Sequence, residues 1–470
     1  MSSLSKLVSK PLSTTRESSS NKVTDISKSS STNLNTKSDS ASNISRTMGT
    51  TVENITEKQE EEINTDDIDE NDDAGQSILL NIISQLRPGS DLSRITLPTF
   101  ILEKKSMLER ITNQLQFPDI LLDAHNGPDP LSRFFQIVKW YMSGWHIAPK
   151  AVKKPLNPIL GEYFTAYWDL PNKQQAFYIA EQTSHHPPES AYFYMIPESH
   201  IRVDGVVIPK SRFLGNSSAA MMEGLTVVTF LDIIDETTGK PEKYTLTQPN
   251  MYARGILFGK MRFELGDHMI IKSSKYEANI EFKTKGFIGG TYDAVQGTIR
   301  EINGKSLYEI TGKWNDVMYY KDLRNKLSSK NQILFDTHTC HPVRPKVRPL
   351  EEQGQYESRR LWKKVTDALA KRDHKVATEE KFQIEDYQRR LAKKRVEDGV
   401  EWYPKLFRKV KPGSDLDYYI YKNIPDGVDN VEEQIKSILE IAPILPGQKF
   451  TQRFSIPAYK KHELQNQSKS

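Results

Sequence analysis

Cysteine is almost missing from this sequence of 470 residues, which contains Cys340 alone. One cysteine allows no intramolecular disulfide and no cysteine-based zinc site, and it fits a reducing compartment such as the cytoplasm. Long hydrophobic runs are missing as well: no stretch of about 18 apolar residues occurs, and the N-terminus has no apolar signal segment. We therefore expect a cytoplasmic protein whose contact with any membrane is peripheral.

The sequence also lacks an excess of one charge and the motifs of common enzymes. Its 65 basic and 61 acidic residues give a net charge of +4, which does not indicate nucleic acid as a partner. No Gly-x-Ser-x-Gly sequence is present, and residues 255–261 are one residue short of a P-loop and lack its Ser or Thr. His338, Cys340 and His341 have no second group of ligands for a metal. We expect neither an enzyme nor a cofactor.

The N-terminal part of the chain divides into a polar tail and a short amphipathic segment. Residues 1–65 are rich in Ser, Thr, Asn and Lys and are predicted to be disordered, because they cannot bury enough apolar surface. Residues 66–97 begin with an acidic run and continue with apolar residues at helical spacing up to Pro88. These apolar residues are Ile78, Leu79, Ile82, Ile83 and Leu86. Two interpretations stay open, a helix docked on the core or a lid over an apolar opening.

Three patterns follow one another in the rest of the chain. Residues 98–160 are predicted to be mainly helical, with a helical zone that begins at Lys104. Residues 161–330 contain roughly a dozen β-prone segments separated by turn residues, which indicates a large antiparallel barrel with a cavity. Residues 331–459 return to helical spacing, and residues 460–470 are predicted to be a frayed tail. The expected fold class is therefore α+β, an antiparallel barrel with flanking helical segments.

Residues 181–188, EQTSHHPP, place two histidines and two prolines between apolar strands. Because proline fixes its own φ and restricts the residue before it, Pro187 and Pro188 are predicted to hold His186 extended. A zinc site needs three or four ligands, and successive residues of an extended segment point to opposite sides, so His185 and His186 are not expected to share a metal. The rigid polar turn indicates a binding site of another kind.

A second polar group lies on a predicted C-terminal helix. Lys381, Glu385 and Arg389 recur at every fourth residue, so they share one helical face. One interpretation is a solvated face whose salt bridges contribute little to stability. The alternative is a phosphate site in which Lys381 and Arg389 bind the anion and Glu385 orients one of them. Further donors would come from the two histidines and from a loop broken by prolines, which contains Lys153, Lys154 and Asn157, if the helix lay across the barrel mouth.

These motifs together resemble those of the oxysterol-binding-protein-related lipid-transfer family. Residues 181–188 are similar to its histidine fingerprint, residues 153–162 (KKPLNPILGE) to a second characteristic loop, and residues 381–389 to its C-terminal Lys/Glu/Arg helix. Three separate motifs in the family's order make the match specific, and the chain resembles the short members of the family. The resemblance implies an incomplete antiparallel β-barrel around a lipid tunnel, closed by an N-terminal lid.

The resemblance also implies ligands and the residues that bind them. Phosphatidylinositol 4-phosphate would be bound by Lys154, Asn157, His185, His186, Lys381, Glu385 and Arg389. The segment 95–101, read as a short extended piece, is similar to the branch of the family that exchanges phosphatidylserine. In that branch the phosphatidylserine site would be formed by Leu97, Lys154, Asn157 and Ser211. No metal is implied.

The expected function is therefore exchange of phosphatidylserine and phosphatidylinositol 4-phosphate between the endoplasmic reticulum and the plasma membrane, one lipid at a time. The expected partners are the two lipids, anionic membrane surfaces contacted transiently, and an anchor protein of the endoplasmic reticulum. Two alternatives stay open: exchange of a sterol for phosphatidylinositol 4-phosphate, and a phosphoinositide sensor that transfers no lipid. A lipid-modifying enzyme is disfavoured, since no nucleophile, metal or nucleotide motif is recognised.

Overall fold

The computed structural model describes residues 88–90, 99–147, 152–257, 260–285, 290–324, 330–425, 430–448 and 459–461. The predicted N-terminal tail, the predicted lid helix, Leu97 and residues 462–470 of the predicted C-terminal tail lie outside the described residues. All described residues belong to one compact unit. Within this part of the chain, no helix is long and apolar enough to cross a membrane.

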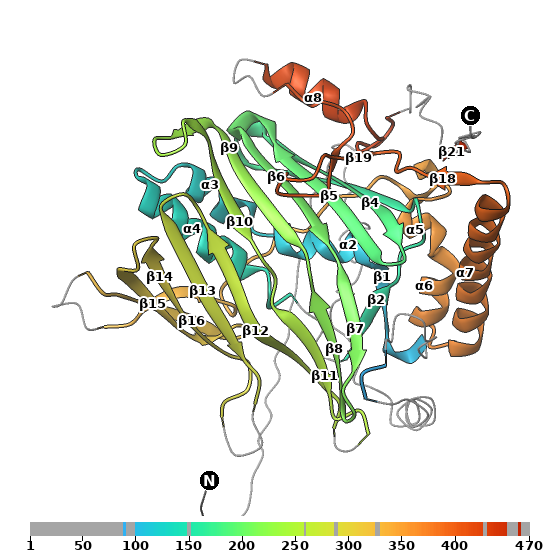
Figure 1. Ribbon diagram of the computed structural model, residues 1–470, viewed down its shortest axis with the longest axis horizontal. Helices are drawn as coiled ribbons and strands as arrows, with labels where there is room; N and C mark the ends of the chain where they lie inside the picture. The colour runs from blue at the N-terminus through green and yellow to red at the C-terminus, as the bar shows by residue number, and fades with distance from the viewer. Residues whose placement is uncertain are drawn as a thin grey trace, which may run out of the picture. The chain divides into compact units, whose positions relative to one another are not determined.

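A 15-stranded antiparallel sheet forms the body of this unit (Figure 1). Its main path runs between two edge strands, β3 (Tyr163–Asp169) and β17 (Gln332–Asp336), which do not pair with each other among the described residues. The barrel is therefore incomplete, as the resemblance implies. The other strands are β4 (Gln175–His185), β5 (Pro188–Ile196), β6 (Ile201–Val207), β7 (Pro209–Phe213), β8 (Ser217–Met222), β9 (Leu225–Asp235), β10 (Lys240–Leu246), β11 (Asn250–Arg254), β12 (Arg262–Lys272), β13 (Tyr276–Lys283), β14 (Ala294–Glu301), β15 (Ser306–Lys313) and β16 (Val317–Asp322).

Alternating side chains explain why these segments form strands with one buried face. In β13, Ala278, Ile280 and Phe282 are buried, whereas Asn279 and Glu281 between them are partly exposed. A period of two places every second side chain on the same face of a sheet. The buried faces of neighbouring strands therefore combine into one apolar core.

Helices α3 (Pro118–His125) and α4 (Pro130–Ser143) pack against this core and lie behind the sheet in Figure 1. The carboxylate of Asp129 caps α4 by accepting hydrogen bonds from two backbone N–H groups of its first turn. Phe134 and Val138 are fully buried on its inner face. The prediction of helix in this part of residues 98–160 is thus confirmed.

The predicted helical zone is wrong at its start. Leu102–Ser106 forms strand β1, which pairs in parallel with β2 (Lys154–Leu156), and helix follows only from α2 (Met107–Arg110). Thr99–Ile101 forms a 3-10 turn where an extended piece was predicted. Pairing with a strand some fifty residues away overrides the helical preference of Lys and Glu in β1. The pairing of β1 with β2 also holds the loop that follows β2 next to the segment that contains β1.

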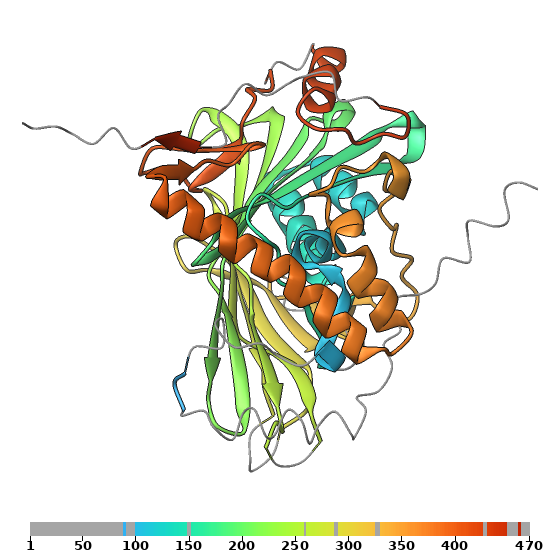
Figure 2. The same cartoon turned by 90° about the vertical axis from the view of Figure 1, so that its right-hand side faces the viewer.

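The C-terminal residues form helices and small sheets beside the large sheet. Helix α7 (His374–Glu397) is the longest, and Figure 2 shows it running diagonally in front of the sheet. Strand β21 (Tyr459–Lys461) pairs with β18 (Val400–Trp402), so the first residues of the predicted tail are paired. The other elements are α5 (Ser358–Leu361), α6 (Lys363–Ala370), β19 (Phe407–Lys409), β20 (Tyr418–Ile420) and α8 (Val431–Leu439).

Buried Glu162 connects three of these parts. Its carboxylate accepts hydrogen bonds from the Ser106 hydroxyl of β1 (2.5 Å), the Ser358 hydroxyl of α5 (2.7 Å) and the Trp362 indole (2.9 Å). It also accepts one from the backbone N–H of Ile159 at 3.0 Å. Burial raises the pKa of the Glu162 carboxyl, and these donors oppose the rise.

Replacing Glu162 with alanine is expected to lower the free energy of unfolding by about 3 kcal/mol, because several buried donors lose their acceptor. Urea denaturation followed by tryptophan fluorescence measures this change. Glu351→Ala, at an exposed position, is the control and should shift stability by less than about 0.5 kcal/mol. Equal midpoints for Glu162→Ala and the unaltered chain would show that the carboxylate does not join these elements.

Candidate functional site

The two histidines of residues 181–188 lie at the tip of the hairpin formed by β4 and β5. His185 is the last residue of β4 and pairs with Pro188, so His186 and Pro187 form the turn. The prediction of an extended His186 with its ring pointing away from His185 is wrong. The two ring centroids lie 4.6 Å apart, because the chain reverses there. The described residues nevertheless contain no group of three or more His, Cys, Asp or Glu placed to bind a metal.

His185 is held by the loop that follows β2. Its Nδ1 lies 3.1 Å from the carbonyl oxygen of Pro158, and since a carbonyl only accepts, Nδ1 donates. Burial lowers the pKa of His185 to about 4, and the neighbouring His186 adds to the lowering. The ring is therefore neutral at pH 7, with Nε2 as an acceptor. His186, in contrast, is exposed.

The predicted face of α7 is present and carries a chain of ion pairs. Lys381 Nζ lies 2.5 Å from one oxygen of Glu385, and Arg389 lies 3.5 Å from the other. Lys381 is only 8% exposed, whereas the Arg389 side chain is 55% exposed. The salt bridges of the first interpretation, a solvated face, are present. Because they border a pocket, they are also compatible with the second interpretation, a phosphate site. The Asp373 carboxylate caps the N-terminus of α7 by accepting a hydrogen bond from the backbone N–H of Val376, which fixes the residue at which the helix begins.

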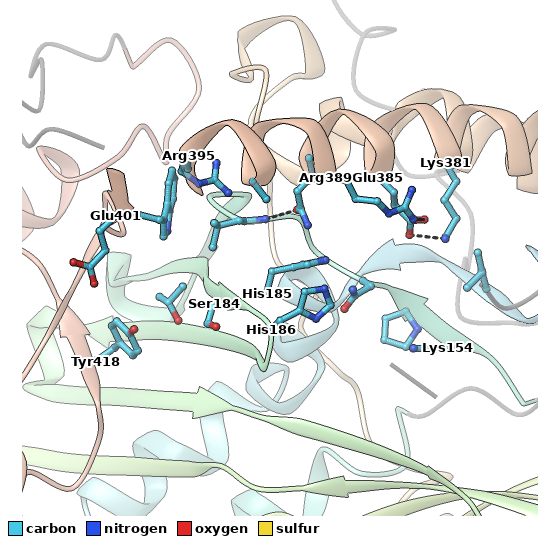
Figure 3. Close-up of a pocket in the computed structure, with 18 residues that line it drawn as sticks. Lys154, Ser184, His185, His186, Lys381, Glu385, Arg389, Arg395, Glu401 and Tyr418 are labelled. Carbon is cyan, nitrogen blue, oxygen red and sulfur yellow. Dashed lines mark hydrogen bonds and ion pairs between the residues drawn. The ribbon is translucent and has the colours of Figure 1, made fainter. Parts of the chain in front are cut away.

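These groups line one polar pocket with a volume of 770 Å³. Figure 3 shows α7 along one side of the pocket and the hairpin turn along the other. The pocket brings together every residue predicted to bind the phosphoinositide: Lys154, Asn157, His185, His186, Lys381, Glu385 and Arg389. Their cationic and N–H groups converge from the loop, the hairpin and the helix, which suits an anion.

A second, apolar cavity of 180 Å³ adjoins the polar pocket. The two share Lys154, Pro155, Asn157, His185 and His186, so these residues form the rim between a polar mouth and an apolar interior. The lining of the inner cavity comes from β7, β8 and β11 and from residues 152–158, among other segments. It includes Ser211, as predicted for the second ligand, whereas Leu97 lies outside the described residues. The arrangement fits an amphiphile with an anionic head.

Gln388 is a pocket residue that the sequence reasoning missed. It is 7% exposed, and its Oε1 accepts a hydrogen bond from the backbone N–H of Leu160 at 2.7 Å. Its side-chain NH2 group has no acceptor among the described residues, although Gln388 lines the pocket. A position three residues after Glu385 falls on the same helical face, so the spacing could have indicated it. Gln388 both fixes the loop and offers a donor.

The variant Gln388→Glu keeps an acceptor for Leu160 but replaces the donor by a carboxylate. Binding of inositol 1,4-bisphosphate should weaken about tenfold or more, while the unfolding midpoint stays unchanged. Gln388→Leu removes both groups and should also lower stability by about 1 kcal/mol. Titration calorimetry and urea denaturation measure the two effects. Unaltered binding by Gln388→Glu would show that Gln388 acts on the loop alone.

Glu181, the first residue of the histidine motif, does not line the polar pocket and instead binds backbone N–H groups of a neighbouring segment. Its buried carboxylate accepts hydrogen bonds from the backbone N–H groups of Lys405 (2.9 Å) and Leu406 (2.8 Å) and a longer one from Phe407. Burial raises the pKa of Glu181 to about 7, and these donors oppose the rise. Glu181 thus anchors the start of β19 on the histidine hairpin.

Comparison with known proteins identifies the family. The sequence profile of the family described as oxysterol-binding protein matches residues 81–368 and 365–426. The chain belongs to the oxysterol-binding protein family. It is 78% identical over 391 residues to oxysterol-binding protein homolog 7 of Saccharomyces cerevisiae, covering 83% of this chain and 89% of that protein. This is a family of lipid-transfer proteins and not of enzymes.

Solved structures of the oxysterol-binding protein family share the fold. The Osh1 ORD domain in complex with ergosterol has a TM-score of 0.61 at 24% identity, covering 77% of this chain and 88% of that domain. The Osh3 ORD of Saccharomyces cerevisiae in complex with PI(4)P has a TM-score of 0.56 at 20% identity, covering 78% and 94%. At these identities the likeness concerns the fold alone. The α+β class and the incomplete antiparallel barrel are thus confirmed.

Proposed function

We propose that this chain exchanges phosphatidylserine and phosphatidylinositol 4-phosphate between two membranes, carrying one lipid at a time. The observation that carries the proposal is the shared rim, where Lys154, Asn157 and the two histidines line both the polar pocket and the apolar cavity. A phosphorylated headgroup in the pocket would place the glycerol at this rim and the acyl chains in the cavity. One rim admits one headgroup.

Charge balance supports a phosphate monoester as one of the ligands. Such a group carries about −1.5 to −2 charges near pH 7 and is costly to bury without partners. The pocket lining brings four positive charges, from Lys154, Lys381, Arg389 and Arg395, and two negative charges, from Glu385 and Glu401. Charge-assisted hydrogen bonds from these groups would offset the desolvation of the phosphate.

The apolar cavity also bears on the main physical obstacle to lipid transfer. Acyl carbon exposed to water costs about 0.8 kcal/mol per CH2, so the tails of a common phospholipid cost on the order of 20 kcal/mol. The apolar lining next to the rim would lower this cost for a lipid in transit. In the proposal, the predicted helix of residues 78–86 acts as the lid over the opening.

The second lipid of the proposal is phosphatidylserine. Lys154, Asn157 and Ser211 line the apolar cavity and are the proposed contacts, together with Leu97. The resemblance of segment 95–101 to the serine-lipid branch supports this choice. The alternative is a sterol, which the Osh1 ORD domain holds in its solved complex, but that domain is only 24% identical to this chain.

A liposome assay tests the proposal. Donor vesicles carry fluorescent phosphatidylserine and acceptor vesicles carry phosphatidylinositol 4-phosphate, and transfer in each direction is followed. The proposal expects phosphatidylserine transfer that accelerates when the phosphoinositide is present only in the acceptor. Binding without transfer would favour a phosphoinositide sensor, and transfer of a sterol alone would favour the sterol alternative. The proposed site of action is contact between the endoplasmic reticulum and the plasma membrane.

Phosphate binding is also expected to be coupled to protonation of His185. The pKa of His185 is lowered to about 4, and a phosphate next to Nε2 would raise it by favouring the charged ring. Protons are therefore taken up on binding once the pH falls toward the raised pKa, and this contribution strengthens binding as the pH falls. Calorimetry in buffers of different ionisation enthalpy measures the uptake. His185→Gln should take up fewer protons than the unaltered chain, and equal uptake would reject the coupling.

A further inference from the structure

Helix α7 carries an exposed stripe beside the polar pocket. Its residues Lys375, Phe382, Arg389 and Val396 follow one another at intervals of seven. A step of seven residues turns a helix by only about 20°, so these side chains share one side of α7 over about 31 Å. All are exposed, Phe382 by 58% and Val396 by 82%. We call them, with the neighbouring exposed Lys393, the α7 stripe.

The α7 stripe borders the mouth of the pocket. Arg389 belongs to both, since it lines the pocket and its guanidinium lies 5.9 Å from the centre of the Phe382 ring. Across the pocket lies the exposed turn of His186 and Pro187. Figure 2 shows α7 in front of the sheet, with its outward side not covered by another described helix or strand. The stripe therefore lies along one edge of the opening through which a headgroup enters the polar pocket.

We propose that the α7 stripe docks the chain on an anionic lipid surface, with Phe382 and Val396 entering the interface. This inference rests on the proposed function, because a lipid can pass from the bilayer into the polar pocket only if the opening of the pocket faces the bilayer. Apolar side chains interleaved with cations are the composition of helices that lie in a membrane interface. The cations of the stripe are suited to lipid phosphates, each being worth about 1 kcal/mol at such a surface.

The ion pairs of the stripe do not oppose this docking. The acidic side chains beside the stripe are paired with cations: Glu397 lies 3.7 Å from Lys393, Glu385 lies 3.5 Å from Arg389, and Asp386 lies 3.0 Å from Arg390. Exposed pairs of this kind contribute about 0 to 1 kcal/mol, so their cations can turn toward lipid phosphates at little cost. Phe382 and Val396 have much of their surface in water and gain by leaving it.

The same helix supplies a matched control. Val376 and Tyr387 are exposed by 42% and 45%, but they lie roughly 120° or more around α7 from Phe382. Phe382→Ser with Val396→Ser and Val376→Ser with Tyr387→Ser each remove one aromatic and one valine side chain from α7. Only the first pair touches the proposed docking surface.

The test is flotation of the full chain with vesicles of phosphatidylcholine and phosphatidylglycerol, an anionic lipid outside the proposed cargo. The Phe382→Ser/Val396→Ser chain should bind about tenfold less, and Val376→Ser/Tyr387→Ser should bind like the unaltered chain. Lys393→Gln should lower binding about fivefold on these vesicles and not on phosphatidylcholine alone. Equal binding by both serine pairs, or an equal loss, would overturn the proposal.

Binding of inositol 1,4-bisphosphate separates this inference from the proposed function. The Phe382→Ser/Val396→Ser chain should bind this soluble headgroup within about threefold of the unaltered chain, the scale of an exposed cation–π contact. Loss of vesicle binding with retained headgroup binding therefore assigns the stripe to docking. If the unaltered chain failed to bind the headgroup, the proposed function would fall, whatever the vesicles show. Loss of both in the variant would contradict a separate docking surface.

Discussion

A chain carrying His185→Ala and His186→Ala is expected to extract phosphatidylinositol 4-phosphate at least about 100-fold less than the unaltered chain. Both rings line the polar pocket, and His185 is positioned there by its hydrogen bond to Pro158. Each ring would donate one hydrogen bond to the phosphate, His185 from Nε2 once the bound phosphate has favoured its protonation. Such a bond to a charged group contributes about 1.5 to 3 kcal/mol, so two of them correspond to a factor of about 100 or more. The measurement is the fraction of labelled lipid removed from vesicles.

The fold should survive this double substitution. His186 is exposed, and His185 makes one hydrogen bond, to the backbone oxygen of Pro158, so the unfolding midpoint should change little. Extraction of phosphatidylserine should persist in part, because Lys154 and Ser211 are unchanged. His338→Ala, an exposed histidine outside the pocket, is the control. An equal loss of both lipids together with a lower unfolding midpoint would point to a structural role.

Blocking the apolar cavity should abolish extraction of both lipids. Ala220 on β8 lines this cavity of 180 Å³, and Ala220→Trp would fill much of the space that an acyl chain needs. If the acyl chain cannot enter the cavity, several of its CH2 groups stay exposed to water at a cost of about 0.8 kcal/mol each, so extraction should fall by more than about 100-fold. Inositol 1,4-bisphosphate, which has no acyl chain, should still bind.

The neighbouring position gives the control for the blocked cavity. Met221 follows Ala220 in β8, does not line the cavity, and points to the other face of the strand. Met221→Trp should therefore extract both lipids nearly as well as the unaltered chain. Retained extraction by Ala220→Trp would mean that the acyl chains are held elsewhere.

The sequence was most informative where the chemistry depends on residue type and spacing. Lys381, Glu385 and Arg389 could be placed on one face because helical geometry is regular, and they do form linked ion pairs. Their convergence with Lys154 and His185 did not follow from any local pattern, since these residues are distant in the chain. From the residues alone it depended on the condition that the helix lies across the barrel mouth, and the family resemblance made it an expectation. The pocket brings these residues together.

Features decided by tertiary contacts were predicted poorly. The sequence of Leu102–Ser106 does not show that it pairs with β2, so a helix was expected from Lys104 onward. His186 was expected to be extended because of the prolines, yet the chain reverses at this point and brings the two rings together edge to face. Glu181 was read as part of a binding motif, although its contacts are the backbone N–H groups at the start of β19.

The central claim is that one rim and one cavity serve two lipids in turn. Native mass spectrometry of the full chain, loaded with a mixture of phosphatidylserine and phosphatidylinositol 4-phosphate, tests it most directly. The account predicts two populations, each with one lipid per chain, and displacement of phosphatidylserine as the phosphoinositide is increased. A chain that holds one molecule of each lipid at the same time would contradict it.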